Sequence, residues 1–158
     1  MKKVILSILF FGFLVSGLSA GELKVPKNAL DPLFNWNVNK YGNLVCMIEL
    51  KNGKKAYFSS VKSMMDFYYR PWYYTEYGAK TTKDIKKMVV QDYITGKVID
   101  AKKALYVFGS RLIGPKGDDL VPFSDRTTLK MFEVKYGGTK VLPFSRISKG
   151  LIKYLDML

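Results

Sequence analysis

Residues 43–71 carry the most constraining pattern in the sequence, two strand-like runs joined by Asn52-Gly53. The first run, at residues 43–50, is rich in Val, Ile and Leu, and the second occupies residues 54–58. Asn-Gly is the strongest short signal for a β-hairpin, because both central positions of its tight turn favour positive φ. The segment therefore predicts a hairpin.

A helix pattern follows the hairpin directly. It begins after Ser59 and Ser60, which are candidate N-caps, and ends at Pro71, since proline cannot donate a helical hydrogen bond. Its apolar residues recur at the spacing of one helix face. They are Val61, Met64, Met65, Tyr68 and Tyr69. Residues 43–71 thus predict a small β-β-helix module.

The second half of the chain repeats this organisation. Strands are predicted at residues 88–94, 97–100, 104–108 and 139–144, a loop at 109–122, and helices at 125–136 and after Ser148. Phe123-Ser124 precedes the helix at 125–136 as Phe58-Ser59 precedes the first helix. The sequence therefore predicts an α+β fold of two similar small ββα-type modules.

We expect these modules at residues 43–71 and 88–158, joined by a long connection at 72–87. Neither is large enough to bury a core alone, so duplicated units of this kind are expected to pack on each other. The residues expected at their contact are Val61, Met64, Tyr68, Leu129 and Phe132.

The first twenty residues have the order of a secretory signal. Lys2 and Lys3 precede an apolar run at residues 4–15 and a group of small residues that ends at Ala20. The run is shorter than the roughly 20 apolar residues of a membrane-spanning helix. We expect a signal peptide at 1–20, cleaved after Ala20 or Ser19, and a periplasmic domain at 21–158. An uncleaved signal would instead hold the protein at the membrane.

Composition excludes several classes of function. The chain has no histidine and a single cysteine, Cys46, which removes histidine-based catalysis, zinc sites of paired cysteines and internal disulfides. No nucleophile-base or carboxylate pair stands out, so we expect no enzyme. The formal charge of +13 favours an acidic protein, an anionic membrane surface or nucleic acid. Because we expect the protein to be exported, we expect no nucleic-acid partner.

Residues from both predicted modules resemble the NosL family of copper accessory proteins. In the second half these include Asp92-Tyr93, Ile99-Asp100-Ala101, Tyr106-Val107, Gly109-Ser110, Gly114-Pro115, Gly117, Pro122-Phe123 and Gly137-Gly138. In the first half they include Ile48, Asn52-Gly53, Phe58, Val61-Lys62, Met64 and Phe67-Tyr68. The resemblance covers roughly residues 31–155, most of the chain.

The resemblance implies a function in the cell envelope. NosL proteins are usually lipoproteins that bind Cu(I) and pass it, through an ABC-type membrane complex and its periplasmic partner, towards nitrous oxide reductase. The implied fold is two similar α+β units, like those of an organomercurial lyase domain. The partners implied here are that maturation complex or another NosL copy.

The chain departs from the family at its copper motif, Cys-Pro-x-Cys-Gly-Met. The aligned residues are Asp31-Pro32-Leu33-Phe34-Asn35-Trp36, and only the proline remains. The family loop Gly-Pro-Met-Gly is Gly114-Pro115-Lys116-Gly117 here, with an ammonium in place of the thioether. Thiolate and thioether ligands select Cu(I), so this substitution predicts a diverged or lost copper site. The lipid-bearing cysteine is missing too.

Three functions stay open on the residues. The first is an accessory protein of this family with a diverged copper site, acting as a docking or regulatory paralogue. The second is a Cu(I) chaperone that uses Cys46 and Met47, although neighbouring strand residues point to opposite faces of a sheet. The third is a binding module whose aromatic, basic residues 67–77 dock on an acidic partner or an anionic membrane.

Overall fold

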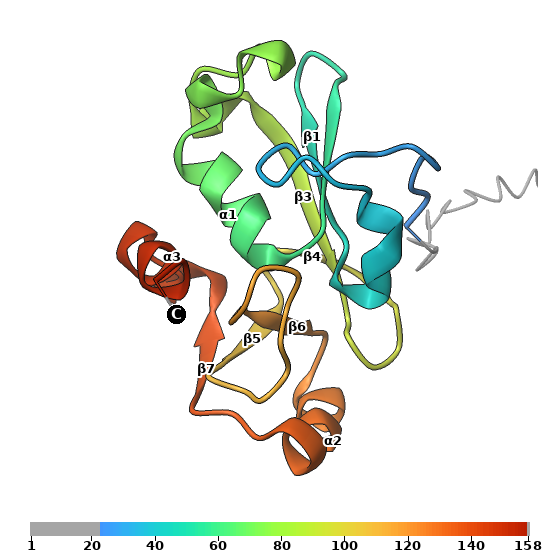
Figure 1. Cartoon of the computed structure of the whole chain (residues 1–158), viewed down its shortest axis with the longest axis vertical. Coiled ribbons are helices and arrows are strands. Elements are labelled where there is room, and N and C mark those ends of the chain that lie inside the picture. The colour runs from blue at the N-terminus through green and yellow to red at the C-terminus, as the bar shows by residue number, and fades with distance from the viewer. Residues whose placement is uncertain (1–22, 158) are drawn as a thin grey trace, which may run out of the picture.

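A computed structural model describes residues 23–157 of the chain. The predicted signal peptide at 1–20 lies outside these residues. Within the described part, no helix combines the length and the apolar character needed to cross a membrane. The predicted α+β class is confirmed: two antiparallel sheets lie one above the other along the longest axis, each accompanied by helices (Figure 1).

The upper sheet has the strand order β2-β1-β3-β4. Its strands are β1 (Cys46–Leu50), β2 (Lys55–Phe58), β3 (Ile85–Gln91) and β4 (Val98–Asp100). The predicted hairpin joins β1 and β2, where Gly53 has a φ of 87° and its N–H donates to the carbonyl of Leu50 at 3.0 Å. Helix α1 (Val61–Tyr69) follows, capped by the Ser60 side chain as predicted.

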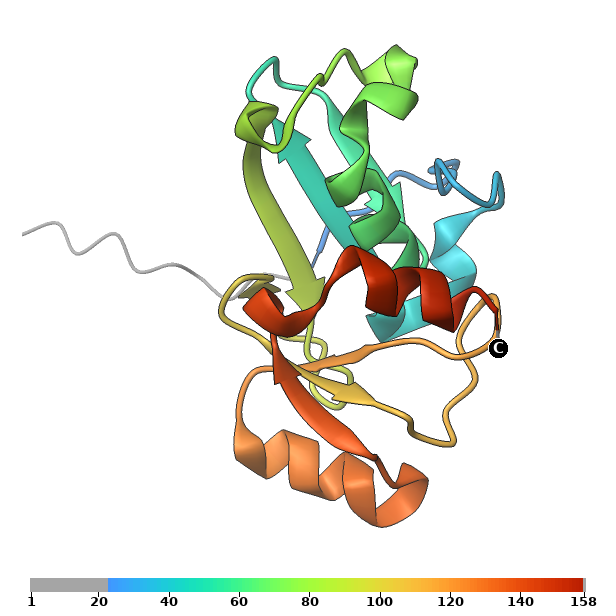
Figure 2. The same ribbon diagram turned by 90° about the vertical axis from the view of Figure 1, so that its left-hand side faces the viewer.

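The lower sheet has the order β6-β5-β7, from strands β6 (Val121–Phe123), β5 (Leu105–Phe108) and β7 (Lys140–Pro143). Helix α2 (Arg126–Tyr136) covers its outer face, and helix α3 (Lys149–Leu155) closes the chain against α1 (Figure 2). Strand β6 overlaps the end of the segment predicted to be a loop, at residues 109–122. Pro122 fits in this strand because β6 is at the edge of its sheet.

The sheets divide the chain differently from the predicted modules. Strand β3 pairs with β1, with Met47 opposite Val89 and Ile48 opposite Met88, and β4 pairs with β3. Both strands therefore belong to the upper sheet, although their position in the sequence predicts them in the second module. The apolar pattern of β3 identifies a buried strand but does not identify which strand it pairs with, because pairing is decided by tertiary contacts.

Two clusters of buried side chains hold the fold together. The larger one joins one face of β1 to α1, α3 and the inner face of the lower sheet, through residues such as Ile48, Met64, Tyr106 and Ile152. The smaller one lies between the lower sheet and α2, and it contains Val107, Val121, Phe123, Leu129 and Phe132. Neighbouring residues of β5 thus face different cores, since side chains alternate along a strand.

The expected contact between the modules is therefore wrong in part. Val61 and Met64 lie in the larger cluster and Tyr68 packs against it, as expected for residues between the modules. Leu129 and Phe132 do not reach α1, because the lower sheet separates α2 from it. They face inward, as predicted, but into the core of their own module.

Short 3₁₀ turns fill the remaining connections. They are η1 (Val38–Leu44), η2 (Pro71–Tyr73), η3 (Thr75–Tyr77), η4 (Thr82–Asp84) and η5 (Phe144–Arg146). The predicted long connection at 72–87 thus begins within η2 and contains η3 and η4, and its last residues already belong to β3.

Candidate functional site: two aspartate-anchored loops

The loop at residues 31–36, predicted to correspond to the family's copper motif, is closed by the carboxylate of Asp31. One oxygen, Oδ2, accepts hydrogen bonds from the N–H of Ser59 at 2.7 Å, the hydroxyl of Ser59 at 2.7 Å and the hydroxyl of Ser63 at 2.8 Å. The other oxygen accepts from the N–H groups of Leu33 and Phe34. Asp31 is 1% exposed, so it is a buried acceptor that ties the loop to the start of α1.

A second aspartate repeats this arrangement in the lower module. Asp92 Oδ2 accepts from the N–H of Ser124 at 2.7 Å, its hydroxyl at 2.8 Å and the hydroxyl of Thr128 at 2.7 Å. Its Oδ1 accepts from the N–H groups of Ile94 and Thr95. Burial raises the pKa of Asp92, but the hydrogen bonds from Ser124, Thr128 and Thr95 outweigh it, so the net pKa is below the ordinary value.

The backbones of the two loops follow the same path. The N–H of Asn35 donates to the carbonyl of Asp31 at 2.8 Å, and Gly96 donates to Asp92 at the same distance. Asn35 and Gly96 both have positive φ, of 56° and 71°. The loop at 31–36 is therefore the structural counterpart of the loop at 92–97.

This duplication explains the faint repeat seen in the sequence. Phe58-Ser59 and Phe123-Ser124 each end a strand, and the serine of each pair bonds the aspartate of a distant loop. Sequence reasoning named Asp31 and Asp92 only in the family comparison and missed their role as anchors. The only sequence signal is a second hydroxyl side chain four residues after each serine. Ser63 follows Ser59 and Thr128 follows Ser124, a spacing that places both hydroxyls on the same helix face.

The predicted family loop, Gly114-Pro115-Lys116-Gly117, lies beside the Asp31 loop. Gly114 donates to the carbonyl of Gly117 at 2.8 Å, which makes a tight turn. The ammonium of Lys116 sits 5.9 Å from the centre of the Phe34 ring, within the range of a cation–π contact. The structure thus brings together the two segments predicted to correspond to the family's copper motifs.

The side chains gathered there are aromatic and cationic. The Phe34 and Trp36 ring centroids lie 4.9 Å apart, and those of Trp36 and Tyr41 lie 5.7 Å apart. The Trp36 indole N–H donates to the Ser59 hydroxyl at 3.0 Å, which fixes the ring against the Asp31 network. No sulfur belongs to either segment, so the site has no soft ligand of its own.

Buried charges lie directly beneath this site. The ammonium of Lys62, whose side chain is fully buried, donates to the carbonyl of Lys116 at 2.6 Å and to that of Leu155 at 3.4 Å. Asp119 Oδ1 accepts from the N–H groups of Lys62 and Leu120 at 2.9 and 2.8 Å. Burial raises the pKa of Asp119 to about 6, although the hydrogen bonds from Ser60, Leu120 and Lys62 act in the opposite direction.

Gly114 is required by this packing. A Cβ at position 114 would lie 2.9 Å from the Cβ of Asp119, which is closer than two such atoms can approach. The loop therefore follows a fixed path over the buried carboxyl.

The other predicted site residues, Cys46 and Met47, do not converge on the loops. Cys46 is fully buried in the larger core, where its thiol donates to the carbonyl of Leu44 at 3.2 Å. Burial, followed by the charges of Asp119 and Asp31, raises the pKa of this thiol well above its ordinary value. Met47 is the next residue of β1 and lies outside that core, consistent with the opposite face of the sheet.

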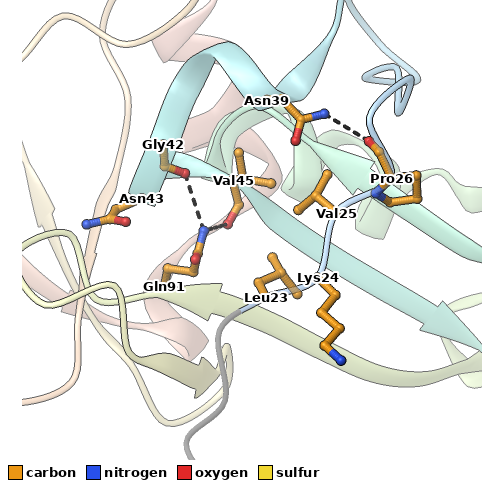
Figure 3. A pocket seen from close by; sticks show the side chains of 9 residues that line it. All are labelled: Leu23, Lys24, Val25, Pro26, Asn39, Gly42, Asn43, Val45 and Gln91. Atoms are coloured by element: carbon orange, nitrogen blue, oxygen red, sulfur yellow. Dashed lines mark hydrogen bonds between the residues drawn. The ribbon is translucent and has the colours of Figure 1, made fainter.

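The described residues offer few other places for chemistry. Within residues 23–157, no group of three or more Cys, Asp or Glu side chains is arranged to hold a metal ion. A hollow of about 640 Å³ lies between the first described residues and the start of β1 (Figure 3). The Gln91 amide spans it, donating to the carbonyls of Gly42 and Val45. Its lining contains Lys24 but no carboxylate or sulfur, so it offers neither an acid-base pair nor a copper ligand.

The fold and the paired loops define a class of small two-sheet α+β proteins with a duplicated anchor. The NosL family model matches residues 23–152, so the chain belongs to the NosL family. Membership of the family does not by itself establish that this chain binds a metal, because the loops at 31–36 and 114–117 differ from the family pattern.

Two solved structures are similar to this chain. The crystal structure of the copper chaperone NosL from Shewanella denitrificans is 19% identical, with a TM-score of 0.68, over 83% of this chain and 98% of that one. The solution structure of apo-NosL from Achromobacter cycloclastes is 25% identical, with a TM-score of 0.46, over 68% of this chain and 87% of that one. Among curated proteins, none matches this sequence significantly.

Proposed function

We propose that this chain is a periplasmic NosL-like accessory protein whose copper site has diverged. In this proposal it serves as a docking or regulatory partner in copper handling for nitrous oxide reductase, and it does not carry Cu(I) itself. The observation that supports the proposal is the contact of Lys116 with Phe34, made by the two segments that align with the family's copper motifs.

The chemistry of that contact disfavours Cu(I) as cargo. A chaperone holds Cu(I) with soft thiolate and thioether ligands that converge on one point. Here the aligned positions present two aromatic rings and an ammonium, and a tethered ammonium repels a cation. The carboxylate at position 31 is a hard ligand, and both of its oxygens already accept hydrogen bonds from the protein.

The rest of the loop supports docking. The aspartate anchors keep the backbones of both loops in place, so a surface at this position persists without a metal. A partner that recognises the shape of a NosL protein would therefore still meet an ordered face. The partners we propose are the ABC-type maturation complex or a copper-competent NosL copy, and the signal-like first twenty residues support a location in the periplasm.

Competition against a chromophoric Cu(I) chelator under reducing conditions tests the proposal. We expect no stoichiometric binding by the native chain, and the same result for Cys46→Ser. Tight binding that disappears in Cys46→Ser would overturn the proposal and establish a chaperone that uses the buried thiol. A copper-competent NosL with the intact motif serves as the positive control.

A further inference from the structure

Four short segments meet at the upper end of the molecule. They are the β1–β2 turn, η2, η3 and η4, and both views place them at the same extremity of the long axis (Figures 1 and 2). Hydrogen bonds join them. The Asn52 amide donates to the carbonyl of Tyr77 at 2.9 Å, and the backbone N–H of Lys51 donates to the carbonyl of Asp84 at 2.8 Å. This end of the molecule is one continuous, braced surface.

Two large rings project from this surface. Trp72 is 61% exposed and Tyr73 is 56% exposed, whereas the residues on either side, Pro71 and Tyr74, are buried. Tyr74 stacks on Phe67 of α1 with ring centroids 4.9 Å apart. The turn is therefore anchored on both sides of the exposed pair, and the rings are held outward.

The same end is lined with lysines. Lys51, Lys54, Lys80 and Lys83 are all exposed there. The ammonium of Lys54 donates to the carbonyl of Glu76 at 2.5 Å, which places a cation directly on η3. Of the nearby acids, Asp84 accepts from the backbone N–H groups of Lys80 and Thr81 and has a lowered pKa, so it remains ionised.

The exposed groups at this end are called here the basic aromatic tip. It consists of Lys51, Lys54, Trp72, Tyr73, Lys80 and Lys83.

We propose that the basic aromatic tip docks on the surface of an anionic phospholipid bilayer. Trp and Tyr favour the membrane interface, where their amphipathic rings sit at the level of the headgroups. Lysines near a surface of anionic lipid add electrostatic attraction, and their stems reach past the rings to the phosphates. The tip is an extremity with outward rings, and this shape suits a planar surface. Recognition of an extended acidic peptide would need a groove.

Vesicle binding by the exported protein, purified from the cell envelope, tests this proposal. Vesicles of phosphatidylcholine alone are compared with vesicles that also contain phosphatidylglycerol. We expect binding only to the second kind, weakened by added salt because surface charges are screened. Removal of Lys80 or Lys83 by substitution with Ala should lower the affinity about fivefold each, in keeping with the attraction of one lysine to an anionic surface.

A matched pair of variants separates the tip from other apolar surface. Trp72→Ala/Tyr73→Ala should lower the affinity about tenfold or more, since interfacial binding scales with buried apolar area. Met131→Ala/Val134→Ala removes two exposed apolar residues on α2, at the opposite end, and should leave the affinity unchanged (Figure 1). Equal losses in the two variants, or none in the first, would overturn the proposal.

Fluorescence reports the location directly. The chain has two tryptophans, so in a Trp36→Phe background the emission comes from Trp72 alone. We expect a blue shift with anionic vesicles and quenching by lipids brominated near the headgroup. Binding to polyglutamate with no response to vesicles would overturn the membrane assignment in favour of an acidic protein. Neither result depends on whether the chain binds copper, so this test is independent of the one for the proposed function.

Discussion

The ammonium of Lys62 lies 2.6 Å from the carbonyl oxygen of Lys116, inside the protein and beneath the candidate site. The same ammonium also donates to the carbonyl of Leu155, near the end of α3, and lies 3.8 Å from the carboxylate of Asp156. One buried side chain thus connects α1, the family loop and the last helix. A cation at a helix C-terminus also opposes the partial negative charge of its carbonyls.

Lys62→Met tests this connection. Methionine keeps most of the volume but leaves both carbonyls without their donor, so the free energy of unfolding should fall by about 1–3 kcal/mol. Hydrogen exchange should accelerate in α3 and in residues 114–117 before the rest of the chain. The exposed Lys149→Met serves as control, and equal protection of α3 in both variants would show that Lys62 does not hold this helix.

The paired aspartates predict matched effects. Asp31→Asn or Asp92→Asn replaces one acceptor oxygen by an N–H₂ group that faces donors, and removes a charge that several hydrogen bonds stabilise. Each variant should lose about 2–4 kcal/mol of unfolding free energy, and the two losses should be similar because the bonds are the same in kind. Denaturant titration measures both, with the half-buried Asp118→Asn as control. A large loss in only one variant would contradict the equivalence of the loops.

Substitution of Phe132 tests whether the lower module has a core of its own. Phe132 is fully buried between Phe123 and Tyr136, with ring centroids at 5.0 and 4.8 Å. Phe132→Ala should cost about 3–5 kcal/mol through lost burial and an unfilled cavity. Its exposed neighbour provides the control, and Met131→Ala should change stability by less than about 0.5 kcal/mol. Similar values for the two would mean that α2 is oriented differently.

Asp119 makes stability depend on pH in a defined direction. Its pKa in the folded protein is about 6, above the ordinary value of 3.8, so the folded state binds the proton more tightly than the unfolded chain. The resulting stabilisation is fully present below the unfolded pKa and is lost as the pH rises through about 6. Between pH 7.5 and 5 the native chain should gain about 1 kcal/mol relative to Asp119→Asn. Denaturation of both proteins at the two pH values measures this, and parallel profiles would assign the proton elsewhere.

The local elements of this fold follow from local signals. Ser60, Asn52-Gly53 and the apolar stripe of α1 each act within a few residues, so the sequence predicts the hairpin, the cap and the helix correctly. The aspartate anchors could not be predicted in this way. Asp31 bonds a serine 28 residues away and Asp92 one 32 residues away, and an isolated Asp in a loop gives no sign of such a partner. Residues that act through long-range contacts become visible only when the two loops are compared in space.

Restoring soft ligands provides the last prediction and the most direct one for the candidate site. The segments at 31–36 and 114–117 are already in contact through Phe34 and Lys116, and the loop backbone has the positive φ at position 35 that the family's glycine would take. Phe34→Cys/Trp36→Met/Lys116→Met replaces the two rings and the ammonium by a thiol and two thioethers, the ligand types that Cu(I) prefers. We expect this triple variant to bind one Cu(I) in chelator competition, whereas Lys116→Met alone should not, because one thioether cannot hold the ion. If the triple variant folds, as circular dichroism would show, and still fails to bind, the aligned segments do not form the copper position in this chain.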